Sequence, residues 1–149
     1  KPFVLIDPAH RYAAQSGLIG EGLPNHRSAF SAVPGPRELG DADKLELRLE
    51  AQGANGVKVA KIYTFKRGSY LIDVRHEIAN GGAQPLATHA YYQLQRNDAA
   101  PEGESAMVMT FTGPAVYTDA EKYQKLDFAD IAKDKAKFAK TADNGWLAM

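Results

Sequence analysis

The feature that most constrains the fold is a regular alternation of apolar and polar residues in the middle of the chain. Leu45, Leu47 and Leu49 are separated by charged residues. Because successive side chains of a β-strand point to opposite faces, this spacing gives a strand with one apolar and one solvated face. The same period recurs in three further segments, residues 57–65, 70–78 and 86–94. The sequence therefore predicts four half-buried strands.

Residues that favour tight turns separate these strands. Asn55-Gly56 follows the first strand, and Asn-Gly readily adopts the positive φ angles of hairpin turns. Further turns are expected at residues 66–69 and 80–82. Three turns that join four consecutive strands predict an antiparallel meander, and short strands with frequent turns favour an all-β sandwich or barrel.

The chain before the meander is rich in glycine and proline, which leaves room only for short strands. Residues 3–6 and 12–14 are predicted strands. Residues 20–40 are predicted to be mostly loop. The N-terminal part therefore adds little regular structure to the meander.

The pattern after the meander is less regular. Two apolar segments, residues 106–111 and 115–117, flank a Gly-Pro pair, and because proline cannot donate to a ladder we expect a bend or an edge there. Residues 127–133 predict at most one short helix, capped by Asp127. Residues 135–141 fit either a strand or a continuation of that helix.

Composition excludes several classes of function. The 18 lysines and arginines are balanced by 18 aspartates and glutamates, so we expect no nucleic-acid partner. The chain has no cysteine, which excludes disulfides, thiolate catalysis and thiolate metal sites. No apolar run reaches the roughly 18 to 20 residues that a membrane-spanning helix needs. Because the chain starts at Lys1 and stops in an apolar run, we expect a piece of a longer protein.

The titratable residues form no recognisable catalytic or metal-binding motif. The four histidines, His10, His26, His76 and His89, lack metal-ligand spacings such as HxH or HExxH. His76 and Glu77 are neighbours in a predicted strand, so their side chains point to opposite faces and cannot act together as acid and base on one atom. His76 is instead expected on the apolar face, as a histidine of the core. We therefore predict no catalytic residue, no metal and no cofactor.

The segment most suggestive of binding contains aromatic residues interleaved with charges, a composition that protein interfaces enrich. The candidate partner-binding residues are Tyr117, Lys122, Tyr123, Lys125 and Phe128. The alternative is that these aromatic residues simply anchor the segment onto the sandwich. The sequence leaves both interpretations open.

Three stretches carry a resemblance to a known family. They are KPFVLID with AAQSGLIG near the start, YTFKRGSYLIDVRHEIANGGAQPL in the middle, and FTGPAVYTDAEKYQKLDFADIA with NGWLAM at the end. Together they resemble the large periplasmic domain of the YidC membrane protein insertases. The match runs in register over most of the chain.

The resemblance implies a fold and a setting. The fold is an antiparallel β-supersandwich similar to galactose mutarotases, in a single periplasmic domain spanning residues 1–149 and truncated at both ends. The parent protein is anchored in the inner membrane, where it inserts and folds membrane proteins, alone or with the Sec translocon. No residue of the insertase groove has a counterpart here. A truncated sheet exposes unpaired backbone groups, so we also expect self-association through an open sheet edge.

The resemblance also orders the functional hypotheses. The first is a non-catalytic domain on the periplasmic side of the inner membrane that contacts a Sec translocon component or a nascent membrane protein. The second is a carbohydrate-binding β-sandwich module that would use an exposed aromatic residue or the groove near His76. A sugar site needs an aromatic platform, whereas Trp146 lies in an apolar run that we expect to be buried. A mutarotase-like enzyme is the third, and a shared fold alone does not confer such an activity.

Overall fold

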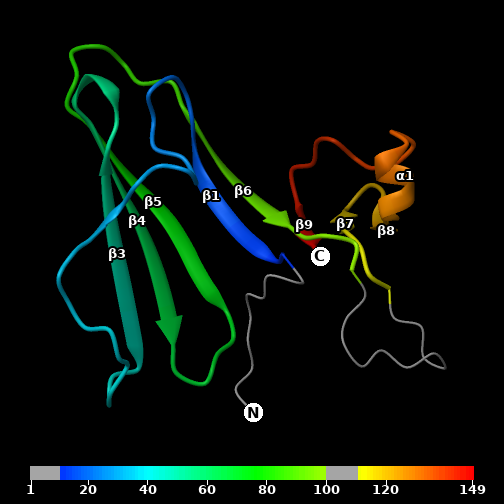
Figure 1. Ribbon diagram of the computed structural model, residues 1–149, viewed down its shortest axis with the longest axis horizontal. Coiled ribbons are helices and arrows are strands. Elements are labelled where there is room, and N and C mark those ends of the chain that lie inside the picture. Colours follow the sequence, from blue (N-terminus) through cyan, green and yellow to red (C-terminus); the bar gives the residue numbers. More distant parts are fainter. Residues whose placement is uncertain (1–10, 100–110) are drawn as a thin grey trace. The chain divides into compact units, whose positions relative to one another are not determined.

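The computed structural model describes residues 11–99 and 111–149, and it shows an all-β chain with one short α-helix in the described part (Figure 1). The chain folds into two compact units. One is Ser16–Tyr92, and the other consists of the described residues up to Gln15 and from Gln93 onward. The all-β class is confirmed, and the single domain over residues 1–149 stays a prediction. The strand predicted at residues 3–6 and most of the apolar segment 106–111 lie outside the described residues.

The larger sheet has four strands in the order β2-β3-β4-β5. Its strands are β2 (Ser31–Ala32), β3 (Lys44–Gln52), β4 (Val57–Lys66) and β5 (Ile72–Asn80). All neighbours are antiparallel, and Leu47, Tyr63 and Val74 lie opposite one another across the three long strands. Because opposed residues share a face, the two-residue period aligns the apolar positions of all three. The first three strands of the predicted meander are confirmed.

The turn between β3 and β4 takes the backbone conformation expected of Asn-Gly. It contains a single 3₁₀ turn, η1 (Ala54–Gly56), and both Asn55 (φ 55°) and Gly56 (φ 75°) are left-handed. These are the residue types that tolerate this region best. The turn therefore fixes the register in which Gln52 faces Lys58.

The fourth strand of the meander was predicted in the wrong place. β6 (His89–Gln95) pairs with β1 (Ala13–Ile19) in a separate two-stranded sheet and not with β5. The turn after β5 is followed by a longer connection containing Pro85, and the Asn80 side chain holds its start by donating to the Gln84 carbonyl at 2.8 Å. This connection lets the chain leave the sheet before the next strand begins.

The core of Ser16–Tyr92 lies between the apolar face of the sheet and the N-terminal segment. Leu18 and Leu23 pack with Val57 and Val59, and Phe30 and Leu86 border the cluster. β1 thus supplies a second layer over the Val57 end of β4, which is sandwich packing. Residues 20–40 are mostly loop, as predicted, and contain only the two-residue β2.

The opposite face of the sheet carries a continuous series of ion pairs. Glu77 accepts from Arg48 at 2.6 Å and from Arg75 at 3.4 Å, and Arg75 also donates to Glu46 at 3.3 Å. Lys44 and Glu50 extend the series at its two ends. We call this series of six residues the ion ladder. Ile62 lies opposite both arginines and is only 2% exposed, because the long side chains cover it.

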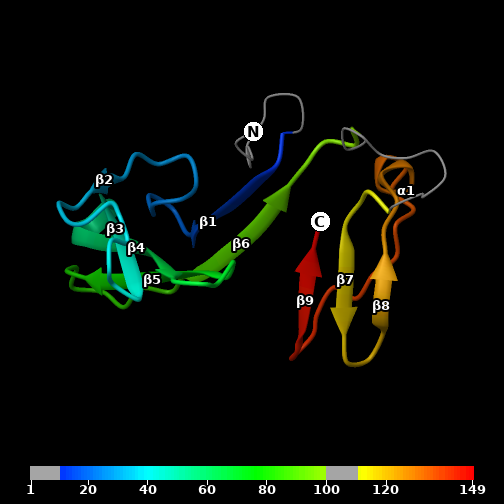
Figure 2. The same ribbon diagram turned by 90° about the horizontal axis from the view of Figure 1, so that it is seen from below.

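The second unit contains a three-stranded antiparallel sheet in the order β8-β7-β9 (Figure 2). Its elements are β7 (Ala115–Thr118), β8 (Lys122–Lys125), α1 (Phe128–Ala132) and β9 (Gly145–Ala148). The predicted strand at 115–117 and the helix after Asp127 are confirmed, although the Asp127 side chain makes no capping hydrogen bond. Residues 135–141 are neither strand nor helix, because Asp134 (φ 53°) turns the chain out of α1.

Candidate functional site

The sheet of the second unit aligns three aromatic residues in one row. Tyr117 of β7 lies opposite Tyr123 of β8 on one side and opposite Trp146 of β9 on the other. Directly opposed residues of antiparallel strands project from the same face. The Trp146 indole stacks on the Tyr117 ring with 5.7 Å between centroids and 9° between planes, and it contacts Tyr123 at 5.8 Å. We call the surface formed by these three residues and Lys125 the aromatic face.

The aromatic face is open to solvent. Trp146 is 48% exposed and Tyr123 is 53% exposed, although both rings contact other rings. The prediction that Trp146 is buried is therefore wrong. The run Trp146 to Met149 is apolar, but its strand β9 lies at the edge of the sheet. The chain between α1 and β9 contacts the other face of the sheet, where the Ala139 N–H donates to the Gln124 side chain at 3.4 Å.

A glycine places Trp146 against Tyr117. A Cβ atom at Gly145 would collide with the Tyr117 carbonyl oxygen, so the close approach of β9 to β7 requires glycine there. The preceding loop is held by Asn144, whose amide donates to the Asp119 carboxylate at 2.8 Å. Together these contacts fix where β9 begins and therefore where the indole lies.

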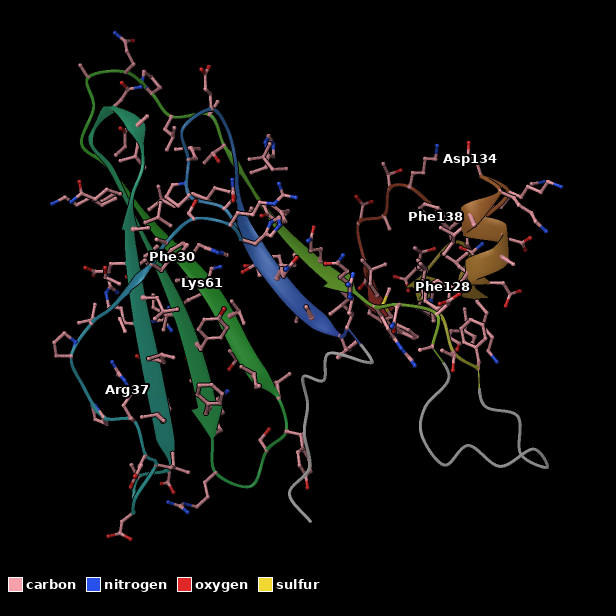
Figure 3. All side chains as sticks on the ribbon, in the orientation of Figure 1. Phe30, Arg37, Lys61, Phe128, Asp134 and Phe138 are labelled. Atoms are coloured by element: carbon pink, nitrogen blue, oxygen red, sulfur yellow. The ribbon has the colours of Figure 1, made fainter. Side chains whose placement is uncertain are left out.

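The structure brings some of the predicted partner-binding residues together and separates others. Lys125 lies two positions from Tyr123 on the same face, with its amine 4.9 Å from the centre of the Phe111 ring. Lys122 occupies the left-handed turn position (φ 58°) at the start of β8 and projects from the other face. Phe128 lies on α1, partly buried and outside the row (Figure 3). Tyr117, Tyr123 and Lys125 thus share a surface, and sequence reasoning missed Trp146 as its fourth member.

The histidines do not assemble a reactive centre in the described residues. His76 is half-buried on the apolar face of β5, whereas Glu77 projects from the opposite face into the ion ladder, as the alternation predicted. Arg48 and Arg75 hold the pKa of Glu77 below its ordinary value, so this carboxylate is a poor proton acceptor. Within residues 11–99 and 111–149 no three potential ligands cluster in a way that could hold a metal ion. His10 lies outside these ranges.

Sequence reasoning also missed a buried lysine. Lys61 belongs to the apolar face of β4, opposite Leu49 and His76, and is 6% exposed. Its amine donates to the Ser16 carbonyl at 2.7 Å and lies 4.9 Å from the centre of the Phe30 ring (Figure 3). Burial lowers the pKa of Lys61, and burial together with the nearby Lys61 charge lowers the pKa of His76. The sequence did indicate this position, because residues 59, 61 and 63 are two apart in a strand and therefore point to the same face.

Comparison with known proteins places the chain in a family. The sequence model of the YidC periplasmic domain matches residues 1–149. The chain belongs to this family. It is 64% identical over 150 residues to the membrane protein insertase YidC of Dechloromonas aromatica and 54% identical over 153 residues to that of Aromatoleum aromaticum. Both alignments cover the whole chain, as does a 50% identical one with the YidC of Nitrosospira multiformis.

The chain spans only part of these YidC proteins. It covers 27% of the Dechloromonas aromatica protein and 28% of the Aromatoleum aromaticum one. In the part of the chain that the structure describes, no helix is long and apolar enough to cross a bilayer. The chain corresponds to the part of these proteins that the YidC periplasmic-domain model matches.

Proposed function

We propose that this YidC periplasmic-domain chain is a non-catalytic protein-contact module on the periplasmic side of the inner membrane. In this proposal it assists insertion and folding of membrane proteins by binding a Sec translocon component or a nascent membrane protein. The aromatic face is the proposed contact surface. The observation that carries the proposal is the half-exposed pair Tyr123 and Trp146, held rigidly by mutual packing.

The chemistry of this surface fits a protein partner. Tyrosine and tryptophan are the residues that most often dominate binding energy at protein interfaces, where a large ring fills a desolvated pocket. Trp146 is already ordered by its stack on Tyr117, so binding would cost little side-chain entropy. Lys125 adds a positive charge beside the rings, where a rim charge contributes to orientation and association rate.

The test is a binding measurement with purified translocon and matched variants. Trp146→Ala and the double change Tyr123→Ala with Lys125→Ala should each weaken binding by at least about tenfold, or about 1.4 kcal/mol. The control is Tyr70→Ala with Lys58→Ala, which removes the same residue types from exposed positions of the other unit. Unchanged affinity in both test variants, with their circular dichroism intact, would rule out this surface.

A carbohydrate-binding module is the second candidate, and the exposure of Trp146 favours it more than the sequence did. A sugar ring can stack on an exposed aromatic face. The Trp146 indole, however, already uses one face against Tyr117. Calorimetric titration with saccharides separates the candidates, because the protein-contact proposal predicts no saturable heat with any sugar.

The proposed absence of catalysis is supported by geometry. The histidine and glutamate that a mutarotase-like reaction would need are His76 and Glu77 in this chain, and they lie on opposite faces of β5. A sugar anomerisation assay tests this directly. Activity that depends on His76 would contradict the proposal.

Self-association through β5 is the remaining part of the proposal. β5 pairs with β4 along its whole length, and none of the described strands pairs with its other edge. Ile72 and Ile78 on this strand are 48% and 41% exposed. Because charged residues protect sheet edges, Ile72→Lys with Ile78→Lys should keep the chain monomeric in light scattering at concentrations where the parent chain associates. Ile131→Lys, at an equally exposed isoleucine on α1, is the control that should leave association intact.

A further inference from the structure

The two faces of the four-stranded sheet differ sharply in charge. Every carboxylate of β3 and β5 projects from the ladder face, because these residues lie opposite Ala60 or Thr64 of β4. They are Glu46, Glu50, Asp73 and Glu77. Lys58 and Lys66 of β4 project from the same face, where Lys66 pairs with Asp73 at 3.0 Å. Lys61 is the one lysine of β4 on the apolar face.

Lys61 therefore carries a buried charge without a carboxylate partner in the described residues. An ammonium group has three donors, and the contacts of this one are a carbonyl of Ser16 and the face of the Phe30 ring. Neither partner carries a formal negative charge. Buried charges in proteins are usually paired, because the loss of hydration is otherwise uncompensated. The amine thus has unused capacity for an anion.

The groups next to Lys61 are also hydrogen-bond donors. His76 lies opposite it, with its Nε2 atom 3.4 Å from the Ser16 hydroxyl and its Nδ1 atom 3.4 Å from the Tyr92 hydroxyl. The Tyr92 hydroxyl also lies 3.4 Å from the Val74 carbonyl, and because all three contacts are at the long limit for hydrogen bonds, both hydroxyl groups are only weakly engaged. Tyr92 is 56% exposed, which gives the cluster an approach from solvent on that side.

We propose that Lys61, Ser16, His76 and Tyr92 form a carboxylate-binding site. The ligand is a carboxylate that accepts from the Lys61 amine and from the neighbouring hydroxyl or imidazole donors. Two sources share this chemistry: a small free carboxylate, and an aspartate or glutamate side chain from another segment of the longer proteins of the family. This site is independent of the aromatic face.

The probe is sodium acetate, followed by NMR of the His76 ring and of the Lys61 side chain. We expect saturable shifts of both signals and a rise in the pKa of His76, because a bound anion offsets the Lys61 charge. Sodium chloride at the same ionic strength should not reproduce them. Lys61→Met should abolish the His76 response, whereas Lys58→Met, on the ladder face, should retain it.

The outcomes also distinguish the two sources. Acetate shifts in this chain but not in a longer form that includes its flanking segments would assign the carboxylate to the protein itself, and shifts in both would assign it to a free ligand. The acetate titration of the unmodified chain reports on Lys61 directly, so the proposal can be tested even if Lys61→Met does not fold. If the Lys61 and His76 signals of the unmodified chain shift linearly with acetate, without saturation, and shift equally with chloride, the proposal is wrong.

Discussion

Trp146 lies parallel to Tyr117 because β9 returns to the strand on which Tyr117 sits and pairs with it residue for residue. The stack joins the last described strand to the first strand of its sheet. It orders an indole at a solvent-exposed edge, where an isolated tryptophan would sample several rotamers. This relationship defines the surface on which the proposed protein contact rests.

Gly145→Ala should break this stack. The added methyl group collides with the Tyr117 carbonyl, so β9 must move away from β7 and take Trp146 with it. We expect reduced near-ultraviolet circular dichroism from the aromatic rings and faster exchange of the β9 amides. The glycine to compare is Gly35, where a Cβ atom meets nothing, and Gly35→Ala should leave both signals unchanged. An intact aromatic signal in Gly145→Ala would show that β9 can shift without losing the stack.

Ile62→Ala should destabilise the chain substantially. Ile62 is among the most completely buried side chains, and its removal leaves a cavity beneath the ladder arginines. Substitutions of this kind typically cost about 2 to 5 kcal/mol, measurable by urea unfolding. Ile131→Ala, on the exposed side of a short helix, should cost far less. A cost below about 1 kcal/mol for Ile62 would mean that the arginine stems collapse into the space.

Stability should rise with pH on the alkaline side because of Lys61. Its folded pKa lies below the ordinary value of 10.5, so the unfolded chain holds more protons as the pH approaches that value. The free energy of unfolding should therefore increase over this range, and Lys61→Met should flatten the increase. An equal slope in the parent and the variant would contradict the assignment of the effect to Lys61.

His76 predicts a change of the same sign at lower pH, where stability should again rise with pH. Its folded pKa is lowered from 6.5 by burial and by Lys61, so the unfolded state binds protons first as the pH falls through that value. Stability should decrease there. Lys61→Met removes the repulsive charge and should lessen the decrease, while His76→Gln should remove this contribution. NMR titration of the ring gives the pKa independently.

The ion ladder should respond to salt and acid. The pKa of Glu77 is lowered mainly by its hydrogen bond from Arg48. The stabilisation that this pair contributes is therefore complete above the ordinary carboxylate pKa and is lost as the pH falls through the lowered value. Arg48→Met keeps much of the apolar stem over Ile62 but removes the charge. We expect this variant to unfold with weaker dependence on salt and on acid than the parent. Identical dependence would show that solvent screening already cancels the ladder.

The alternation of residues predicted the strands well because it reports a local property, the face to which each side chain points. β3, β4 and β5 were predicted with nearly correct bounds. The partner of β6 could not be predicted in the same way. Alternation says that His89–Gln95 forms a strand, but the contacts that pair it with β1 join residues far apart in the chain, such as the Thr88 hydroxyl that donates to the Ile19 carbonyl at 2.9 Å.

The candidate site shows the same division. Tyr117, Tyr123 and Lys125 were predictable from composition, and the strand period places Tyr123 and Lys125 on one face. Trp146 was not, because an apolar run reveals its hydrophobicity but not what covers it. The position of Lys61 on the apolar face could be predicted from the two-residue period alone, since it follows Val57 and Val59 on that face.

The ion ladder has a consequence for how this molecule meets others. Its three cations, Lys44, Arg48 and Arg75, are balanced by three glutamates, so an approaching protein must first separate several bonded groups. Breaking these ion pairs costs free energy, so this face of the sheet disfavours non-specific protein binding. The proposed contact surfaces, the aromatic face and the backbone edge of β5 that no described strand pairs with, use groups outside this network of bonded charges.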